Sequence, residues 1–377
     1  MKLGLLTFHT AANFGAALQA YALQEFLEDE GFNAEYIDYQ NHHRRMIYDM
    51  PFRVKVCVKK RKLLEASYYA MGMPFMNMRK RKFEDFNHKY LHISDTFYCD
   101  KKDMEKSNGL YDMFIVGSDQ VWNPGNNGKD TAFMLSFVHD DEKKISYASS
   151  FGLSEVPDSI KNDYAESMKR ITHLSTRELS GVRIIKELTG RDAKLVLDPV
   201  FLLPRIQWME LIADCPMTGN YLFSYTNRKD QMSEFLRTGY DMKGMKHHKL
   251  SRFTTISDFF NPKVKIKYDM SPQEFLANIN GAKMVVSASF HCICFAIILN
   301  KPFICFLTGN EGKDERLKTL LTHFGLTERV YKEGMPLSDV MKPIDWERVN
   351  RIVEEKRNDS SAFLRGALKQ GTKGGFS

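Results

Sequence analysis

The sequence predicts a chain of two doubly wound, Rossmann-like α/β domains. Three observations predict this class. Short apolar runs alternate with periodic helical segments, which is the pattern of a parallel sheet. The 377 residues are more than one ordinary core holds. The composition, 43% hydrophobic and 27% charged, is typical of a soluble globular protein. With no apolar stretch of roughly 20 residues and no secretory cleavage pattern, we expect a cytoplasmic protein.

The N-terminal domain is expected over residues 1–200. It begins with a strand at 2–7, and then a helix with an apolar stripe around Leu18 to Leu27 ends at Gly31, a glycine in the usual position after a helix. Further strands are expected at 34–39, 112–116, 143–148, near 174 and at 194–197. Strand, helix and strand in succession argue for parallel pairing.

A basic segment interrupts this series. Residues 41–108 lack strand alternation, and we expect them to form helical excursions from the domain. Within them, residues 41–90 hold 13 Lys or Arg and four Asp or Glu, although the whole chain carries a formal charge of only +7. Such a patch attracts phosphates, nucleic acid or an anionic membrane surface, and charge alone does not choose among them.

The C-terminal domain is expected over residues 201–340. Residues 341–377 follow as charged helices that end in a Gly/Lys tail, and we expect this tail to be disordered. A strand at 221–225 opens it. Ser271-Pro272-Gln273-Glu274 has the form of a capping box and predicts a helix that ends at Gly281. Strands at 283–287 and 302–307 flank an apolar helix at 292–299.

Ligands of such sheets bind beyond the carboxyl ends of the strands. This rule selects the loops at 8–17, 117–124 and 287–291 and the loop after 307, with a cleft between the domains. The chain has no Gly-x-Gly-x-x-Gly motif, no Walker phosphate loop, no His-Glu-x-x-His and no cysteine pair with metal spacing. We therefore expect neither a metal nor a cofactor.

The first two loops carry polar residues that suit a hydroxyl-rich ligand. His9, Asn13 and Gly15 lie where the first strand turns into its helix, although Asn13 could serve only as a helix cap. Asp119, Gln120 and Trp122 follow the strand at 112–116. Their polar groups could bind sugar hydroxyls and the indole could cover a ring. The alternative is a turn held by Asp119, with Trp122 in the core.

His291 is the sharpest candidate for chemistry. It follows a buried strand at the start of a helix, and histidine is the side chain best suited to acid or base work near neutrality. Arg177, Asn310 and Arg316 also lie where strands pass into helices, and such an arginine can hold a carboxylate or a phosphate. A structural histidine and an ordinary ion pair are the alternatives.

Taken in order, these motifs resemble the polysaccharide pyruvyl transferase family over roughly residues 1–330. The resemblance rests on Thr7-Phe8-His9 with Asn13 to Leu23, Val116-Gly117-Ser118-Asp119-Gln120-Val121-Trp122-Asn123, Ser175-Thr176-Arg177-Glu178, Leu197-Asp198-Pro199, Ser289-Phe290-His291 and Asn300-Lys301-Pro302-Phe303. Each motif is weak alone, and the ordered set is fairly specific.

The resemblance implies a GT-B-like fold, phosphoenolpyruvate as donor and a saccharide as acceptor. The product would be a cyclic pyruvate ketal on two sugar hydroxyls, with phosphate released. It further implies that His291 and Arg177 serve the donor. We expect Ser289, Asn310 and Arg316 to assist there, whereas His9, Asn13, Gly15, Asp119, Gln120 and Trp122 would serve the acceptor.

Two departures from the family pattern concern the histidine. The family usually has Asp where this chain has Ala288, and Gly where it has Cys292. His291 is therefore either a general acid or an anchor for the donor phosphate.

The acceptor and the rival functions complete the expectations. A lipid-diphosphate-linked acceptor would explain the basic residues 41–90, which would then meet an anionic membrane at its inner face. The rivals are a GT-B glycosyltransferase that uses a nucleotide sugar and a basic nucleic-acid-binding protein. The second lacks any RNP-like or helix-turn-helix pattern, so we expect no nucleic-acid partner.

Overall fold

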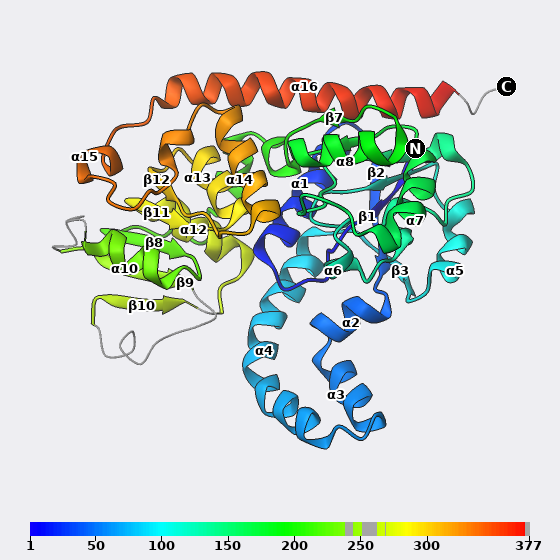
Figure 1. Ribbon diagram of the computed structural model, residues 1–377, viewed down its shortest axis with the longest axis horizontal. Coiled ribbons are helices and arrows are strands. Elements are labelled where there is room, and N and C mark those ends of the chain that lie inside the picture. The colour runs from blue at the N-terminus through cyan, green and yellow to red at the C-terminus, as the bar shows by residue number, and fades with distance from the viewer. Residues whose placement is uncertain (238–243, 251–261, 268, 374–377) are drawn as a thin grey trace. The chain divides into compact units, whose positions relative to one another are not determined.

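The computed structural model describes residues 1–237, 244–250, 262–267 and 269–373. They form two compact units. The first holds Met1–Leu202 and the described residues from Arg357 onwards, and the second holds Leu203–Lys356. Each is built on its own parallel sheet (Figure 1). The predicted α/β class is confirmed, whereas the GT-B-like arrangement and the cleft stay predictions. The Gly/Lys tail at 374–377 lies outside the described residues.

The sheet of the first unit has the order β3-β2-β1-β4-β5. Its strands are β1 Lys2–Leu6, β2 Asn33–Tyr39, β3 Ile93–Tyr98, β4 Met113–Val116 and β5 Lys144–Ser146. The chain enters at the central strand β1, runs outward to β3, and returns to place β4 on the other side of β1, which makes the sheet doubly wound. Isolated parallel bridges continue it towards the short pair β6 Ser175–Thr176 and β7 Lys194–Leu195.

Local sequence explains the ends of the first helix. Helix α1 Phe14–Asp29 begins after Asn13, whose side chain accepts hydrogen bonds from the backbone N–H groups of Gly15 and Ala16. It ends before Gly31, which has a φ of +83° as predicted for a glycine in this position. The sheet and helices of this unit enclose a large aromatic core that includes Phe114, Phe133 and Phe137. The other helices are α5 Lys101–Met104, α6 Pro124–Asn127, α7 Asp158–Lys169 and α8 Leu179–Thr189.

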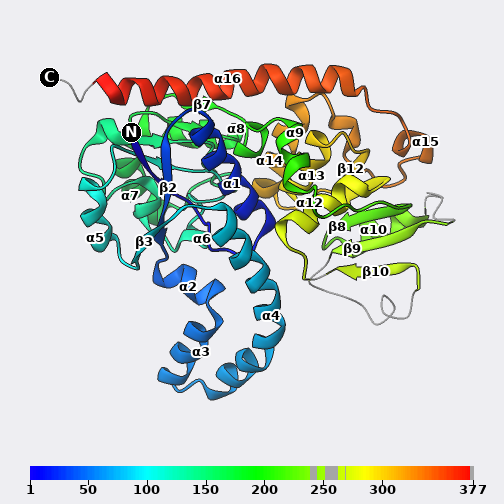
Figure 2. The same cartoon turned by 180° about the vertical axis from the view of Figure 1, so that it is seen from behind.

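The basic segment forms three helices, α2 His42–Tyr48, α3 Met50–Lys59 and α4 Leu63–Tyr90. We call these residues, 42–90, the helical arm, and both views show it extending below the sheet of the first unit (Figures 1 and 2). The prediction of helices throughout 41–108 is wrong at β3, which forms the edge of the sheet. Its sequence, Ile-Ser-Asp-Thr-Phe-Tyr, is half exposed, so no buried face enforces an apolar alternation.

The sheet of the second unit repeats the same order as β10-β9-β8-β11-β12. Its strands are β8 Tyr221–Tyr225, β9 Lys246–Leu250, β10 Val264–Lys267, β11 Met284–Ser287 and β12 Phe303–Cys305. Its helices are α9 Arg205–Leu211, α10 Lys229–Arg237, α12 Pro272–Gly281, α13 Phe290–Ile298, α14 Glu311–His323 and α15 Leu337–Val340. The predicted capping box is confirmed, since Ser271 and Glu274 exchange both hydrogen bonds. Strands β9 and β10 were not predicted because both are rich in lysine.

Helix α16 Trp346–Lys373 closes the described chain. Residues 341–377 were predicted to be a separate C-terminal segment, but the described residues from Arg357 onwards belong to the first unit. Arg365 pairs with Glu30 at 2.7 Å, and Ser360 accepts a hydrogen bond from the Leu197 backbone at 2.9 Å. No helix among the described residues has the length and apolar character that a bilayer span needs.

Candidate active site

Each sheet has one point where the chain reverses its winding direction, and three of the four predicted loops lie at these points. In the first unit this switch point lies between β1 and β4, which pair up to Leu6 and Val116. In the second unit it lies between β8 and β11, which pair up to Tyr225 and Ser287. Doubly wound sheets bind ligands at such points, beyond the carboxyl ends of the strands. The loops after β1, β4 and β11 carry most of the predicted site residues.

Hydrogen bonds between side chains and backbone fasten the first switch point. Thr7 Oγ1 donates to the Ser118 carbonyl at 2.8 Å, and Gln19 donates to Thr7 at 3.1 Å. Asn13 caps α1, so its amide oxygen is engaged as the alternative interpretation expected, and Gly15 is buried in the first turn of that helix. The loop after β1 is thus held in one shape by its own polar groups.

His9 lies beneath this loop, without exposure to solvent. Its Nε2 is 3.4 Å from a carboxylate oxygen of Asp38, and its ring stacks on Tyr36 with centroids 5.7 Å apart. Asn87 of the arm donates to the His9 carbonyl at 3.0 Å. In this conformation the predicted acceptor ligand His9 has no exposed atom to offer, and its carbonyl joins the loop to the arm.

The loop after β4 offers polar groups at its surface. Asp119 has a φ of +79°, and its carboxylate accepts the backbone N–H of Gln120 at 2.8 Å. The Gln120 side chain accepts from Asn123 at 3.0 Å and from Asn126 at 3.3 Å. Both Asp119 and Gln120 are half-buried. A non-glycine residue in this backbone region is strained, which is a feature common at functional sites.

Trp122 belongs to the core. It is fully buried, its indole N–H donates to the Phe133 carbonyl at 2.9 Å, and its ring lies 5.1 Å from that of Phe151. An indole enclosed in this way has no face left for a sugar ring. In this conformation Trp122 occupies the core position that the alternative interpretation expected, and it anchors the loop there.

Arg177 is also buried, at 3% exposure, among acids of the same unit. Its guanidinium donates to Asp198 and, at 2.8 Å, to the Ser118 hydroxyl. Asp119 and Glu178 each approach it to 3.9 Å. Burial opposes the charge, but these three carboxylates outweigh it and raise the pKa of Arg177. With one cation among three anions, Arg177 supports the loop after β4 as the alternative of an ion pair expected, and its donor role stays a prediction.

The second switch point is organised differently. Ser287 donates to the Tyr225 carbonyl at 2.7 Å and accepts the Ser289 N–H at 3.0 Å, which ties the two strand ends together. Ser289 occupies the N-cap of α13, but its side chain makes no capping hydrogen bond. His291 follows as the second residue of that helix, at 8% exposure. The positive end of α13 is therefore not neutralised by its own cap.

One cation lies beside this helix. Arg316 of α14 lies with its guanidinium carbon 5.6 Å from the centre of the Phe290 ring, next to His291 in sequence. Asn310 instead caps α14 by accepting the Lys313 N–H at 3.1 Å. Asp314 accepts two backbone N–H groups of the loop after β12, from Thr308 at 2.7 Å and Gly309 at 2.8 Å. Of the two helix starts, α13 suits an anion, whereas α14 is already occupied by Asn310 and Asp314.

Comparison with known proteins adds the family. The profile of the polysaccharide pyruvyl transferase family matches residues 13–310. The chain belongs to this family. The match contains every predicted site residue except His9 and Arg316, which lie just outside it. No curated protein matches the chain. Within the described residues no group of three or more His, Cys, Asp or Glu could hold a metal ion.

Solved structures similar to this pyruvyl transferase family member span most of its length at very low identity. UDP-GlcNAc 2-epimerase from Neisseria meningitidis is 9% identical, covering 98% of this chain and 100% of that chain with a TM-score of 0.49. Arabidopsis thaliana UGT89C1 is 7% identical, covering 98% and 94% with a TM-score of 0.48. The E. coli heptosyltransferase WaaC is 11% identical, covering 81% and 88% with a TM-score of 0.39.

Sequence reasoning missed two arginines of this family member. Arg44 of the arm is buried with its guanidinium carbon 3.6 Å from the centre of the Phe8 ring. Burial lowers its pKa, while the charge of Asp119 raises it. Arg228 follows β8 and donates to the Thr308 carbonyl at 3.1 Å, between two strand ends of the second sheet. Both arginines lie in charge-rich sequence, where a single arginine cannot be singled out as a site residue. The position of Arg228 just after a strand is the one sequence signal that could have identified it.

Proposed function

We propose that the chain transfers the carboxyethylidene group of phosphoenolpyruvate onto two hydroxyls of a saccharide and releases phosphate. The observation that carries this proposal is the family match over residues 13–310, because it includes the loops after β4 and β11, which carry Asp119 and His291. Membership of the family supports a transferase acting in polysaccharide biosynthesis. The donor, the site residues and the nature of the acceptor are the proposed part.

The donor would bind at the second switch point. Phosphoenolpyruvate carries a phosphate and a carboxylate and has no ring to stack on, so its site needs concentrated positive charge. The uncapped start of α13 offers backbone N–H groups and the positive end of a helix dipole. Arg316 and Arg228 add guanidinium groups on neighbouring elements, and the Ser289 hydroxyl remains uncommitted to capping.

The chemistry requires a proton at the methylene carbon of the donor. Protonation of that carbon makes the adjacent carbon electrophilic, and one sugar hydroxyl adds there and loses its own proton. The bond from that carbon to the phosphate oxygen then breaks, phosphate leaves, and a second hydroxyl adds with loss of its proton. The product is a cyclic ketal. Of the two sugar protons, one replaces the proton that the acid gave to the methylene carbon, and the other goes to the departing phosphate.

His291 is the proposed general acid, and the alternative role is that of an anchor for the donor phosphate. Ala288 stands where the family usually has an acid, so in this chain no carboxylate at that position orients the imidazole. Either role places the histidine at the donor, and kinetics separate them. General acid catalysis typically contributes about 10²- to 10⁴-fold in rate.

The acceptor would bind at the first switch point. Asp119 and Gln120 present a carboxylate and an amide at half-buried positions, and such groups suit sugar hydroxyls. Asn13, Gly15 and His9 act behind them by fixing the loop after β1. We further propose that the acceptor is linked to a lipid diphosphate, which the basic helical arm would accompany at an anionic membrane surface.

Phosphate release tests the proposal directly. The protein is mixed with phosphoenolpyruvate and a panel of lipid-linked saccharides, and the product is analysed by mass. We expect phosphate release that depends on a saccharide, together with a product that gains the mass of a pyruvate ketal. A thermal shift with nucleotide sugars and none with phosphoenolpyruvate would contradict the proposal and favour a glycosyltransferase.

A further inference from the structure

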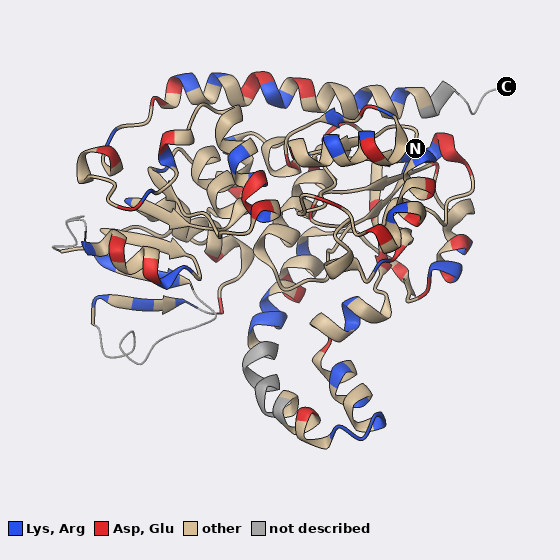
Figure 3. Cartoon of the chain, viewed as in Figure 1, with Lys and Arg blue, Asp and Glu red and all other residues tan. Residues whose placement is uncertain are grey.

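The turn between α3 and α4 of the helical arm combines two kinds of exposed side chain. Residues 59–64, which we call the arm tip, read Lys-Lys-Arg-Lys-Leu-Leu. Leu63 is 66% exposed and Leu64 is 88% exposed, and Val58 just before the tip is also exposed. Figure 3 shows the basic residues gathered at this end of the arm. Consecutive exposed leucines behind four consecutive cations are unusual on a protein surface.

The backbone of the arm tip is ordered by hydrogen bonds and carries strain. The N–H of Arg61 donates to Val58 at 2.9 Å and the N–H of Lys62 donates to Cys57 at 2.9 Å, which is a Schellman ending of α3. Arg61 occupies the left-handed position of this motif with a φ of +57°. Glycine is the residue that this position favours, so an arginine here lowers local stability.

Most of the charge at the arm tip is uncompensated. Lys62 pairs with Glu65 at 2.9 Å, an exposed pair of small energetic value. Within the described part of the chain, no acid pairs with Lys59, Lys60 or Arg61. An anionic surface would therefore meet several cations that no nearby acid of the protein neutralises.

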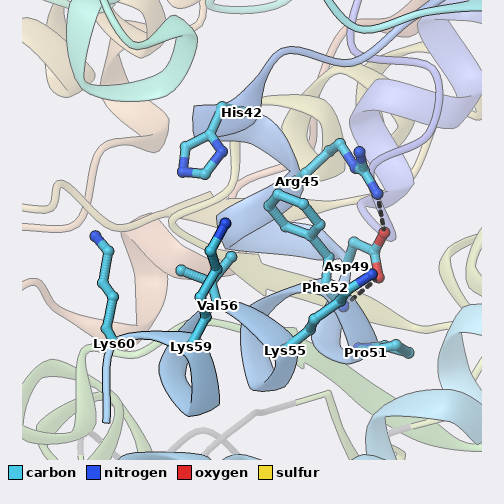
Figure 4. A pocket seen from close by; sticks show the side chains of 9 residues that line it. All are labelled: His42, Arg45, Asp49, Pro51, Phe52, Lys55, Val56, Lys59 and Lys60. Carbon is cyan, nitrogen blue, oxygen red and sulfur yellow. Dashed lines mark hydrogen bonds and ion pairs between the residues drawn. The ribbon is translucent and has the colours of Figure 1, made fainter. Parts of the chain in front are cut away.

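A groove on the same arm extends the basic surface (Figure 4). It has a volume of about 800 Å³ and lies along α2 and α3. Phe52 and Val56 form apolar walls, and the Arg45 guanidinium lies 3.9 Å from the centre of the Phe52 ring. Lys55, Lys59 and Lys60 line it beside a single acid, Asp49. Cations around an apolar floor suit phosphate headgroups that arrive with their hydrocarbon attached.

We propose that the arm tip and this groove dock the protein on an anionic lipid bilayer. Cations meet the headgroups, while Leu63 and Leu64 enter the boundary between headgroups and acyl chains. A nucleic acid would satisfy the cations but would offer nothing to two exposed leucines, whereas a bilayer satisfies both. The inference deepens the proposed function, on which its biological purpose rests, because a lipid-linked acceptor resides in such a membrane. Binding itself requires neither donor nor catalysis.

Sedimentation with vesicles tests the proposal on the whole chain. We expect retention on phosphatidylcholine vesicles that contain phosphatidylglycerol at low salt, and none on pure phosphatidylcholine. Raised salt should release the protein, because screening acts over about 10 Å at 0.1 M ionic strength. Arg61→Gly should weaken the partition coefficient about five-fold, the usual effect of one cation near an anionic surface. Its melting temperature should not fall, because glycine suits the turn.

Further variants separate charge from apolar insertion. Leu63→Ser with Leu64→Ser should weaken partitioning by about ten-fold or more, because two leucines lose their apolar environment. Lys101→Gln with Lys102→Gln and Leu110→Ser are the matched controls. Leu110 is 53% exposed and lies outside the arm, and these substitutions should leave partitioning unchanged.

The proposal is overturned if anionic vesicles do not retain the protein at low salt, or if the arm-tip variants are retained as well as the controls. Retention of duplex DNA at physiological salt with loss of vesicle binding would also overturn it. The thermal shift with phosphoenolpyruvate, measured without vesicles, reports on the proposed function alone. Vesicle binding without that shift would remove the proposed function and leave the docking surface.

Discussion

The two switch points lie in sheets of the same strand order, but they differ in how their loops and helix starts are hydrogen-bonded. In the first unit the loops are tied to each other by Thr7 and Ser118, and α1 is capped by Asn13. In the second unit the strand ends are tied by Ser287, but α13 has no side-chain cap. The same topology thus presents one helix start with a side-chain cap and one without.

The charges around the two points differ in the same sense. Arg177 in the first unit is outnumbered by three carboxylates, whereas Arg316 lies beside the start of α13 in the second unit. A neutral, hydroxyl-rich ligand is compatible with an acidic, hydrogen-bonded loop, and an anionic ligand is compatible with an open helix start. This difference supports the proposal that acceptor and donor bind to different units, and changing either switch point tests it.

The largest expected effect is at His291. His291→Gln should lower kcat by about 10²- to 10⁴-fold with the donor KM nearly unchanged if the imidazole is the acid. A raised donor KM as well would identify a phosphate anchor. Asp119→Asn is the matched change at the other switch point, and it should alter the KM of the acceptor only. Steady-state kinetics of phosphate release measure kcat, the donor KM and the acceptor KM. Near-normal turnover in His291→Ala would rule out His291 both as the general acid and as the phosphate anchor.

The next effect concerns stability at the first switch point. Arg177→Ala should lower the free energy of unfolding by about 3–5 kcal/mol, because it leaves buried carboxylates without their cation. Urea denaturation measures this loss. Arg183→Ala, which breaks an exposed pair with Glu187, should change it by no more than about 0.5 kcal/mol. If Arg177→Ala were as stable as Arg183→Ala and failed only in donor binding, the donor role would be supported.

The sequence could predict the position of a residue where a local pattern determines it, but not where contacts with distant elements do. His291 and Asn13 were placed correctly because a buried strand followed by a helix start is a local pattern. The partner of Arg177 could not be predicted, since Asp198 lies on a different element and only the folded sheet brings the two together. Trp122 was undecided for the same reason, because burial of an indole depends on Phe133 and Phe151.

The fold was predictable wherever strands are buried on both faces. The central strands β1, β4, β8 and β11 read as apolar runs, and the structure contains them at the predicted places. Strands β3 and β10 lie at the edges of their sheets, where no two-sided burial requires an apolar run. Strand β9 is an inner strand, but His247 and His248 fill two of its buried positions, so the segment reads as polar.

A smaller effect tests the two helix starts themselves. Asn13→Ala removes two hydrogen bonds to the first turn of α1 and should lower the free energy of unfolding by about 1 kcal/mol. Ser289→Ala should leave it unchanged, because that side chain makes no capping bond, and should raise the donor KM instead. Thermal melts and kinetics on the pair measure this. An equal loss of stability in both would show that the two starts do not differ.

The smallest effect compares the half-buried His173 of the first unit with the buried His248 of the second. Burial lowers the pKa of His173 in the first unit and of His248 in the second, where Lys246, Lys265 and Lys267 lower it further although the hydrogen bond to Asn278 raises it. Both are therefore neutral in the folded protein under conditions where the unfolded chain, with a histidine pKa of about 6.5, takes up protons. Stability must then be greatest above about pH 6.5 and fall as the pH drops towards the lowered pKa of the folded state.

Substitution at each position separates the two contributions to this pH dependence. His248→Asn should reduce the dependence of the second unit's free energy of unfolding on pH, and His173→Asn should do the same for the first unit. Above about pH 6.5, each substitution should also lower the free energy of unfolding somewhat. Urea denaturation across this pH range measures the slope. His139→Asn, at an exposed position, is the control and should leave the slope as it is. If neither His248→Asn nor His173→Asn changed the slope of the free energy of unfolding against pH, other titratable groups in both units would govern the loss of stability in acid.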